Sequence, residues 1–264
     1  MSTKKNQPLE GRKIVVTRAA DQSGSLVELL AAEGAEVIEL PLIQTRCTGP
    51  TLDTQEAFKE LWTYEWLIFT SPNGVRYFFE LFFKTFDDIR SLGGAHIAAV
   101  GNGTAEALRK FYIKAELIPE VQTSEGLAEA LTREQTLDNL NILIVTGNQA
   151  SEELSASLEA ALAIVDKVQF YSTERNDISK HPSAARFRSE GADAIVFASG
   201  SAVESFVAQA KDLKTEANAR RPQACSIGPV TTEIMKKYGI PVDISAAKPT
   251  PSDIVKALCK HFAK

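Results

Sequence analysis

The sequence has few of the side chains that bind metal ions or form disulfides. Its three cysteines, Cys47, Cys225 and Cys259, are far apart, and none forms a Cys-x-x-Cys or Cys-His pair. The three histidines are equally scattered along the 264 residues. We therefore expect free thiols, no structural metal ion and no histidine-based catalytic triad.

Long apolar runs and an excess of basic charge are also missing. No run approaches the roughly 20 apolar residues that a transmembrane helix requires. The basic start, MSTKKNQPLEGRK, is not followed by the apolar stretch and cleavage site of a secretory signal. The net charge of −5 is small and gives no sign of the basic face typical of nucleic-acid-binding proteins. These features predict a cytoplasmic protein that binds neither membranes nor nucleic acids.

Sequence motifs for nucleotide cofactors are absent as well. The pair Gly101 and Gly103 lacks the third glycine of a Gly-x-Gly-x-x-Gly turn, since Thr104, Ala105 and Glu106 follow it. There is no Gly-Lys-Ser of the P-loop type, and no pyridoxal or flavin pattern stands out. We expect no organic cofactor.

The sequence does contain an internal repeat, whose matching parts fall at turns between strands and helices. The matching segments are IVVT at Ile14 with ILIVT at Ile142, LIFTSPNGV at Leu67 with IVFASGSAV at Ile195, VGNGTAE at Val100 with IGPVTTE at Ile227, and TSEGLAEAL at Thr123 with TPSDIVKAL at Thr250. The first two pairs are 128 positions apart and the last two 127. The repeat predicts two related lobes, which would form a cleft suited to a ligand.

Within each repeat, short β-branched runs alternate with helical patterns, which is typical of an α/β fold with a mainly parallel sheet. Residues 13–17 form a continuous apolar run. Leu26, Leu29 and Leu30 then follow at helical spacing, and Gly34 stands where a helix would end. Other expected strands are 37–40, 67–69, 97–100, 142–145, 168–171, 195–197 and 225–227.

Two extended segments at equivalent places in the repeat lead into loops without a helical pattern. The first contains Pro41, which a strand tolerates only at an edge or a crossing point. If the chain crosses between lobes there, one lobe comprises residues 1–40 and 174–264 and the other residues 46–168, with linker strands at 41–45 and 169–173. Composition alone fits a single cut near Leu140 equally well.

Seven turns rich in small and hydroxyl residues precede expected helices. They are TSPNG at Thr70, VGNGT at Val100, QTSEG at Gln122, TGNQAS at Thr146, ASGSA at Ala198, IGPVT at Ile227 and TPSD at Thr250. The backbone N–H groups at a helix start can hold carboxylates or phosphates. Each turn alone could equally be an ordinary helix cap.

Several motifs together resemble the uroporphyrinogen-III synthase family. They are VTR at Val16, IFTSPNGV at Ile68, AVGNGTAEAL at Ala99, the tyrosine of VQFYST, VFASGSAVESF at Val196, IGPVTTEIMKKYGI at Ile227 and PTPSDIVKAL at Pro249. They cover almost the whole chain in the family's order. The resemblance implies two α/β lobes joined by a two-stranded β-ladder, with the active site in the cleft between them, no metal or cofactor, and a monomer.

The resemblance also implies a reaction. Such enzymes close the linear tetrapyrrole hydroxymethylbilane, which carries an acetate and a propionate on every pyrrole, into uroporphyrinogen III, with loss of water and inversion of the last pyrrole through a spiro intermediate. The family's linker tyrosine maps onto Tyr171, which would assist departure of the hydroxyl. Tyr171 could instead be a packing residue of the ladder.

Matching positions in the family's motifs give candidates for binding the substrate carboxylates. They are Ser71, Asn73, Gly101, Thr104, Ser199, Ser201 and Thr231, with Arg18 as a fixed positive charge. Arg18 could also be a surface arginine at a strand end. Val230 and Thr232 depart from residues common in relatives, which weakens the case for the IGPVT turn.

Two other classes fit parts of the sequence. A hinge-closing protein could bind a polyanionic small molecule with the same turns and no catalysis, and turnover separates it from the enzyme. A flavodoxin-like interaction domain would show an exposed apolar face, of which the balanced composition gives no sign.

Overall fold

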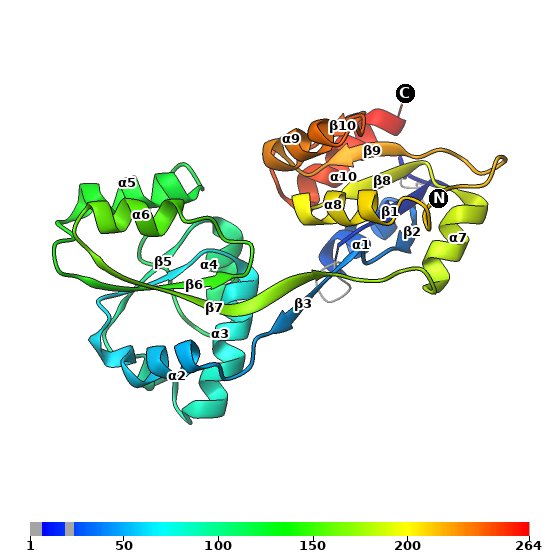
Figure 1. Ribbon diagram of the computed structural model, residues 1–264. Helices are drawn as coiled ribbons and strands as arrows, with labels where there is room; N and C mark the ends of the chain where they lie inside the picture. The colour runs from blue at the N-terminus through cyan, green and yellow to red at the C-terminus, as the bar shows by residue number, and fades with distance from the viewer. Residues whose placement is uncertain (1–6, 19–23, 264) are drawn as a thin grey trace, which may run out of the picture. The chain divides into compact units, whose positions relative to one another are not determined.

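The computed structural model describes residues 7–18 and 24–263 and divides into two compact units (Figure 1). Unit 1 comprises Met1–Gln44 and Glu174–Lys264, and unit 2 comprises Thr45–Thr173. Each unit has its own five-stranded sheet, which confirms the predicted α/β fold with two mainly parallel sheets. Among the described residues, no helix combines the length and apolar character needed to cross a membrane.

The sheet of unit 1 is entirely parallel, with the strand order β10-β9-β8-β1-β2. Its strands are β1 (Lys13–Val16), β2 (Glu36–Glu39), β8 (Ala194–Phe197), β9 (Gln223–Ser226) and β10 (Ile244–Ser245). The central β8 is buried along its whole length, because helices cover both faces of the sheet.

Within the described residues of unit 1, five helices form the outer layers. They are α1 (Gly24–Ala32), α7 (Pro182–Glu190), α8 (Gly200–Ala208), α9 (Pro229–Lys237) and α10 (Pro251–Phe262). One core packs Leu26 of α1 and Leu258 of α10 against Val16 and Val196. The opposite face packs α7, α8 and α9. As predicted, Leu26 and Leu30 are buried on α1, and Gly34 follows its end with a φ of 89°. Leu29, expected in the same apolar stripe, is instead 40% exposed.

Unit 2 has the strand order β3-β7-β6-β4-β5. Its strands are β3 (Ile43–Cys47), β4 (Trp66–Phe69), β5 (His96–Ala99), β6 (Asn141–Gly147) and β7 (Ile164–Arg175). Its helices are α2 (Leu52–Lys59), α3 (Pro72–Thr85), α4 (Asn102–Arg109), α5 (Ser124–Glu134) and α6 (Glu153–Ala160), with short 3-10 helices at Leu61–Thr63 and Ile89–Leu92. Figure 1 shows α5 and α6 on one face of this sheet and α2 and α3 on the other.

Strand pairing confirms the internal repeat. The order β2-β1-β8-β9-β10 in unit 1 corresponds to β7-β6-β4-β5 in unit 2. In unit 2, a single parallel bridge between Ala98 and Leu117 takes the place of the pairing between β9 and β10. These two residues lie 127 positions before Cys225 and Ile244, which pair in unit 1. The two units therefore share one topology, entered at different points of the chain.

The extended segment around Pro41 consists of two strands that belong to different sheets. Strand β2 ends at Glu39, and β3 begins at Ile43 and pairs with β7. Proline has no N–H to continue a ladder, which fits the break. The β3–β7 pair is antiparallel, because Asn176 N donates to Leu42 O at 3.0 Å while Thr48 N donates to Phe170 O at 3.1 Å. The chain passes from unit 1 to unit 2 within β3 and returns within β7.

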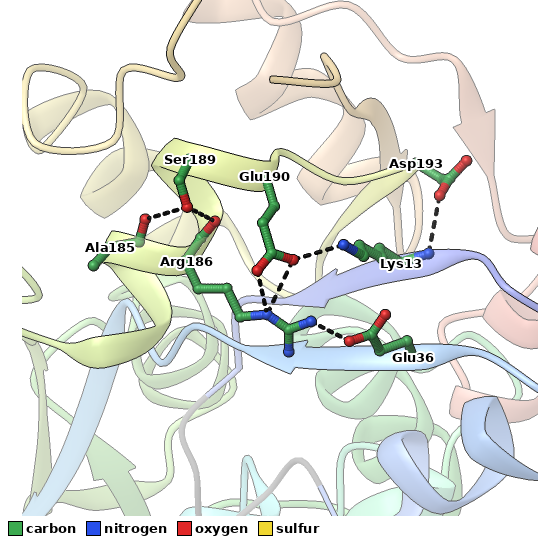
Figure 2. Close-up of polar contacts among 7 residues, drawn as sticks. All are labelled: Lys13, Glu36, Ala185, Arg186, Ser189, Glu190 and Asp193. Atoms are coloured by element: carbon green, nitrogen blue, oxygen red, sulfur yellow. Dashed lines mark hydrogen bonds and ion pairs between the residues drawn. The ribbon is translucent and has the colours of Figure 1, made fainter. Parts of the chain in front are cut away.

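A group of ion pairs lies at the amino ends of the strands of unit 1 (Figure 2). The carboxylate of Asp193 accepts hydrogen bonds from Lys13 N at 2.9 Å, from Arg12 Nη1 at 2.9 Å and from Arg220 Nη1. Nearby, Glu190 accepts from Lys13 Nζ at 2.6 Å and from Arg186 Nε at 3.2 Å. These contacts join α7 and the loop before β9 to the amino end of β1.

Asp193 is the buried member of this group, with its side chain 4% exposed. Burial opposes ionisation, but the hydrogen bond from Lys13 N and the two arginines outweigh it and lower the pKa of Asp193. A carboxyl group with a lowered pKa stabilises the fold at neutral pH, and this contribution disappears as the pH falls through its pKa.

We predict that Asp193→Asn lowers the free energy of unfolding at neutral pH by about 2 kcal/mol, because it leaves two arginines without their counter-charge. The difference from the wild type should shrink once the pH lies below the ordinary carboxyl pKa of 3.8. Denaturant unfolding of the variant and the wild type, at neutral pH and at a pH below 3.8, measures this difference in stability. Glu233→Gln, which removes an exposed pair with Lys236 on α9, is the matched control and should change stability by less than about 0.5 kcal/mol. An equal loss for Asp193→Asn at both pH values would contradict this role.

Candidate functional site

In both sheets, the chain reverses its direction of strand addition at one point. In unit 2 it continues from β4 to β5 on one side and from β6 to β7 on the other, so the reversal lies between β4 and β6. In unit 1 it lies between β8 and β1. Open α/β sheets bind ligands outside the carboxyl ends of the strands at such a reversal. The two candidate regions are therefore the carboxyl ends of β4 and β6 and those of β8 and β1.

A pocket of about 230 Å³ lies at the reversal in unit 2. Thr70 and Ser71 line it from the end of β4, and Thr146 and Gly147 from the end of β6. The Thr70 hydroxyl donates to Val145 O at 3.1 Å and so ties the two strand ends together. Polar groups from Ser124, Gln149, Ser151, Ser155, Lys167, Tyr171 and Thr173 complete much of its lining.

The phenol of Tyr171 is the titratable group in this pocket with the most enclosed surroundings. Its ring stacks on Tyr77, with centroids 5.7 Å apart and planes at 21°. Its hydroxyl lies 2.9 Å from Ser71 Oγ. Burial raises the pKa of Tyr171 above its ordinary value, and the hydrogen bond with Ser71 only partly offsets this. The phenol is therefore neutral at physiological pH and can donate a proton or a hydrogen bond.

A β-bulge determines where Tyr171 points. Thr146 pairs with Gln169, whereas Gly147 pairs with Tyr171, so Phe170 is an extra residue in β7. Side chains normally alternate along a strand, but here both Phe170 and Tyr171 are buried in the same apolar cluster. Regular alternation would place Tyr171 on the opposite face of the sheet from Phe170. Because of the bulge, both side chains lie on the same face.

Gly147 provides the space for the Tyr171 ring. A Cβ atom at this position would lie 2.7 Å from Tyr171 Cε2 and closer still to Cζ, which is incompatible with the observed ring position. The next residue, Asn148, holds the strand beyond Tyr171: its Oδ1 accepts from Thr173 N at 2.8 Å and its Nδ2 donates to Thr173 O at 3.3 Å. Sequence reasoning missed the roles of both residues, although the TGN triplet after a strand was visible.

Lys167 is the cation that lines the pocket, and its ammonium group supports the loop after β6. Its Nζ donates to Ala150 O at 3.2 Å, Ser151 O at 2.9 Å and Glu152 Oε1 at 2.8 Å. These contacts use all three ammonium hydrogens. The hydrogen bond from Lys167 also lowers the pKa of Glu152. Lys167 therefore shapes the pocket wall and carries no unused donor toward a ligand.

All seven turns predicted to precede helices do so, at α3, α4, α5, α6, α8, α9 and α10. Ser71 caps α3, and its Oγ accepts from Gly74 N at 3.0 Å. Ser199 caps α8 in the same way through Ala202 N at 3.2 Å, and its Oγ lies 3.0 Å from Ser201 Oγ. These hydroxyls serve as caps, so they are engaged by protein groups before any ligand arrives.

Glycine is the N-cap residue of both α4 and α9 and has no side chain to cap the helix, but the two helix starts differ in what lies against them. At α4, Gln122 Oε1 accepts from Asn102 N at 3.0 Å and packs against Gly101. At α9, the equivalent neighbour of Gly228 is Pro249, which cannot accept such a bond from its side chain. Sequence reasoning missed Gln122, because only the folded chain brings it to the start of α4.

The structure distributes the predicted binding residues over both carboxyl edges. In unit 2, Ser71 and Tyr171 are in direct contact, while Asn73 lies in the first turn of α3. In unit 1, half-buried Arg18 follows β1, and Ser199 and Ser201 follow the neighbouring β8. The hydroxyl residues Thr104 and Thr231 are only 4% and 3% exposed, so their side chains face the core. Among the described residues, no cluster of three or more His, Cys, Asp or Glu side chains could hold a metal ion.

Comparison with known proteins places the sequence among tetrapyrrole enzymes. The family model for Uroporphyrinogen-III synthase HemD matches residues 24–256. The "Porphyrin biosynthesis protein HemD" of Ruminiclostridium josui is 32% identical over 96% of this chain, which spans about half (49%) of that relative's length. The uroporphyrinogen-III synthase of Synechococcus elongatus is 28% identical over 96% of both chains.

The fold is also similar to a solved structure. A mutant uroporphyrinogen III synthase from Thermus thermophilus superimposes with a TM-score of 0.62, at 17% sequence identity, over 96% of this chain and 98% of that chain. Identity this low supports the fold alone, whereas the family model covers most of the sequence. The chain belongs to the uroporphyrinogen-III synthase HemD family.

Proposed function

We propose that this protein is a uroporphyrinogen-III synthase, which closes hydroxymethylbilane into uroporphyrinogen III with loss of water and inversion of the last pyrrole. The observation that supports this most is that, in a chain of this family, a neutral phenol lines a pocket at the strand reversal of unit 2. We further propose that the protein acts as a monomer in the cytoplasm, as its family resemblance implies.

Tyr171 is the proposed catalytic group. Departure of hydroxide from the terminal hydroxymethyl carbon, together with the N–H proton of the same pyrrole, gives water and an electrophilic azafulvene. A hydrogen bond from the phenol would stabilise the leaving hydroxide. The raised pKa of Tyr171 supports this role, because the phenol keeps its proton at physiological pH. The azafulvene is then attacked by the substituted carbon of the last pyrrole, and the spiro intermediate fragments and closes with that ring reversed.

Binding of the substrate's acetates and propionates is assigned to helix starts at the carboxyl edges. The backbone N–H groups there suit carboxylates, and the dipoles of α3, α4, α8 and α9 reinforce them. Ser71, Asn73, Gly101, Thr104, Ser199, Ser201 and Thr231 are the positions proposed for this role, with Arg18 adding charge. Because Thr104 and Thr231 are buried, their contribution would come through the backbone.

Isomer analysis of the product tests the proposed function. Hydroxymethylbilane is generated in place, the protein is added, and the oxidised type I and type III uroporphyrins are separated. Spontaneous closure of hydroxymethylbilane gives the type I isomer. With the wild-type protein present, the main product should instead be the type III isomer. Type I alone, at the uncatalysed rate and with the bilane still bound, would instead identify a binding protein.

Replacing the phenol hydroxyl should slow catalysis without unfolding the protein. We predict that Tyr171→Phe lowers kcat by about tenfold or more, because the leaving hydroxyl loses its hydrogen bond. The stacking on Tyr77 should survive, so the melting temperature should change little. Single-turnover kinetics together with thermal unfolding measure both effects. Wild-type kinetics in this variant would remove Tyr171 from the chemistry and leave it as a packing residue.

Adding a methyl group at Gly147 should displace the Tyr171 ring. We predict that Gly147→Ala lowers kcat by about tenfold and costs about 1–3 kcal/mol of stability, since the ring must move or the bulge must open. Gly94→Ala is the matched control, because a Cβ at Gly94 would meet no atom within 4 Å. Comparable losses in the two variants would show that the close approach at Gly147 has no special importance.

A further inference from the structure

We propose that Ser71 is a positioning residue that donates its hydroxyl proton to Tyr171 Oη, which leaves the phenol's own proton to point into the pocket. The catalytic consequence of this inference rests on the proposed function, whereas the direction of the hydrogen bond between Ser71 and Tyr171 does not depend on it. The two oxygens are 2.9 Å apart, and their distance alone does not tell which one donates.

The other contact of Ser71 favours this direction. Its Oγ already accepts a hydrogen bond from Gly74 N at 3.0 Å, as the cap of α3. The start of a helix carries a partial positive charge, so a hydroxyl there directs its oxygen toward the helix and its proton away. Tyr171 Oη is the polar atom that lies in that direction. An oxygen that accepts one hydrogen bond also becomes a better donor in the next.

Within the part of the chain that the structure describes, the hydroxyl of the neighbouring Tyr77 contacts Thr45 and does not compete for the hydroxyl of Tyr171. Tyr77 Oη donates to Thr45 O at 2.8 Å, and it also lies 2.9 Å from Thr45 Oγ1. The single hydroxyl proton of Tyr77 is therefore used within its own contacts. Its ring covers one face of Tyr171 without bonding to its hydroxyl. The proton of Tyr171 is left for a group in the pocket, where a leaving hydroxyl would lie.

The sign of a pKa change distinguishes the two directions without reference to activity. If Ser71 donates to Tyr171, the bond stabilises the phenolate, and Ser71→Ala should raise the pKa of Tyr171. If Tyr171 donates to Ser71, the bond stabilises the neutral phenol, and the same substitution should lower that pKa. Titration of the tyrosine Cζ resonances by ¹³C NMR measures this, with Tyr171 assigned from the signal missing in Tyr171→Phe.

Kinetics then test the catalytic consequence through a double-mutant cycle. Ser71→Ala should lower kcat by about fivefold. KM should change little, because the backbone N–H groups at the start of α3 would still bind a carboxylate. Ser71→Thr should restore kcat, and Ser71→Ala should have no further effect in the Tyr171→Phe background. Thr51→Ala is the matched control, because it removes a similar cap from α2 of the same unit, in which Thr54 N donates to Thr51 Oγ1 at 3.2 Å.

Each outcome decides one part of the proposal. A lowered pKa of Tyr171 in Ser71→Ala, or an equal loss of kcat in the wild-type and Tyr171→Phe backgrounds, would overturn the positioning role and leave Ser71 as a helix cap. A wild type that produces no type III isomer would reject the synthase function, while the NMR titration would still decide the direction of the hydrogen bond.

Discussion

The close approach of the Tyr171 ring to the backbone of Gly147 is the contact on which the pocket of unit 2 depends. It requires a residue without a Cβ at the end of β6 and an extra residue, Phe170, in the facing part of β7. Aromatic side chains fix the rest: Phe170 packs against Phe78 with centroids 5.1 Å apart, and Tyr77 stacks on Tyr171 itself. Because this side of the strand is closely packed, the phenol is held in one place, and holding a group in place is itself a source of catalytic rate.

The two ends of the strands serve different purposes. In unit 1, the amino ends carry the paired charges of Asp193 and Glu190, which join secondary-structure elements. The carboxyl ends carry hydroxyl groups and the starts of helices. This division explains how a chain of net charge −5 could bind a substrate rich in carboxylates. The attraction would come from local backbone dipoles, which act within the first helical turn, and does not require a positive protein.

Much of this arrangement could be predicted from the sequence because it depends on local signals. Apolar runs and helix-capping residues lie within a few residues of where they act, and the observed strands and helix caps confirm them. The repeat acts over a longer range, and the matching strand orders of the two units confirm it. The bulge at Phe170 could not be predicted, because regular alternation in VQFYST puts Phe170 and Tyr171 on opposite faces. The same holds for Gln122 at the start of α4, since that contact joins segments 20 positions apart. Pro41 signalled a special place in the chain, but the division of its segment between two sheets follows from the pairing of β3 with β7.

We propose that helix starts at the carboxyl edge of each sheet bind the substrate's carboxylates. Two-dimensional NMR of backbone amides, during titration with a linear tetrapyrrole carboxylate that lacks the hydroxymethyl group, tests it most directly. We expect the amide signals in the first turns of α3 and α4 in unit 2, and of α8 and α9 in unit 1, to shift and saturate as the ligand is added, while those around Asp193 stay in place. Saturable binding that leaves the first-turn amides unshifted, or that shifts the amino ends of the strands instead, would contradict it.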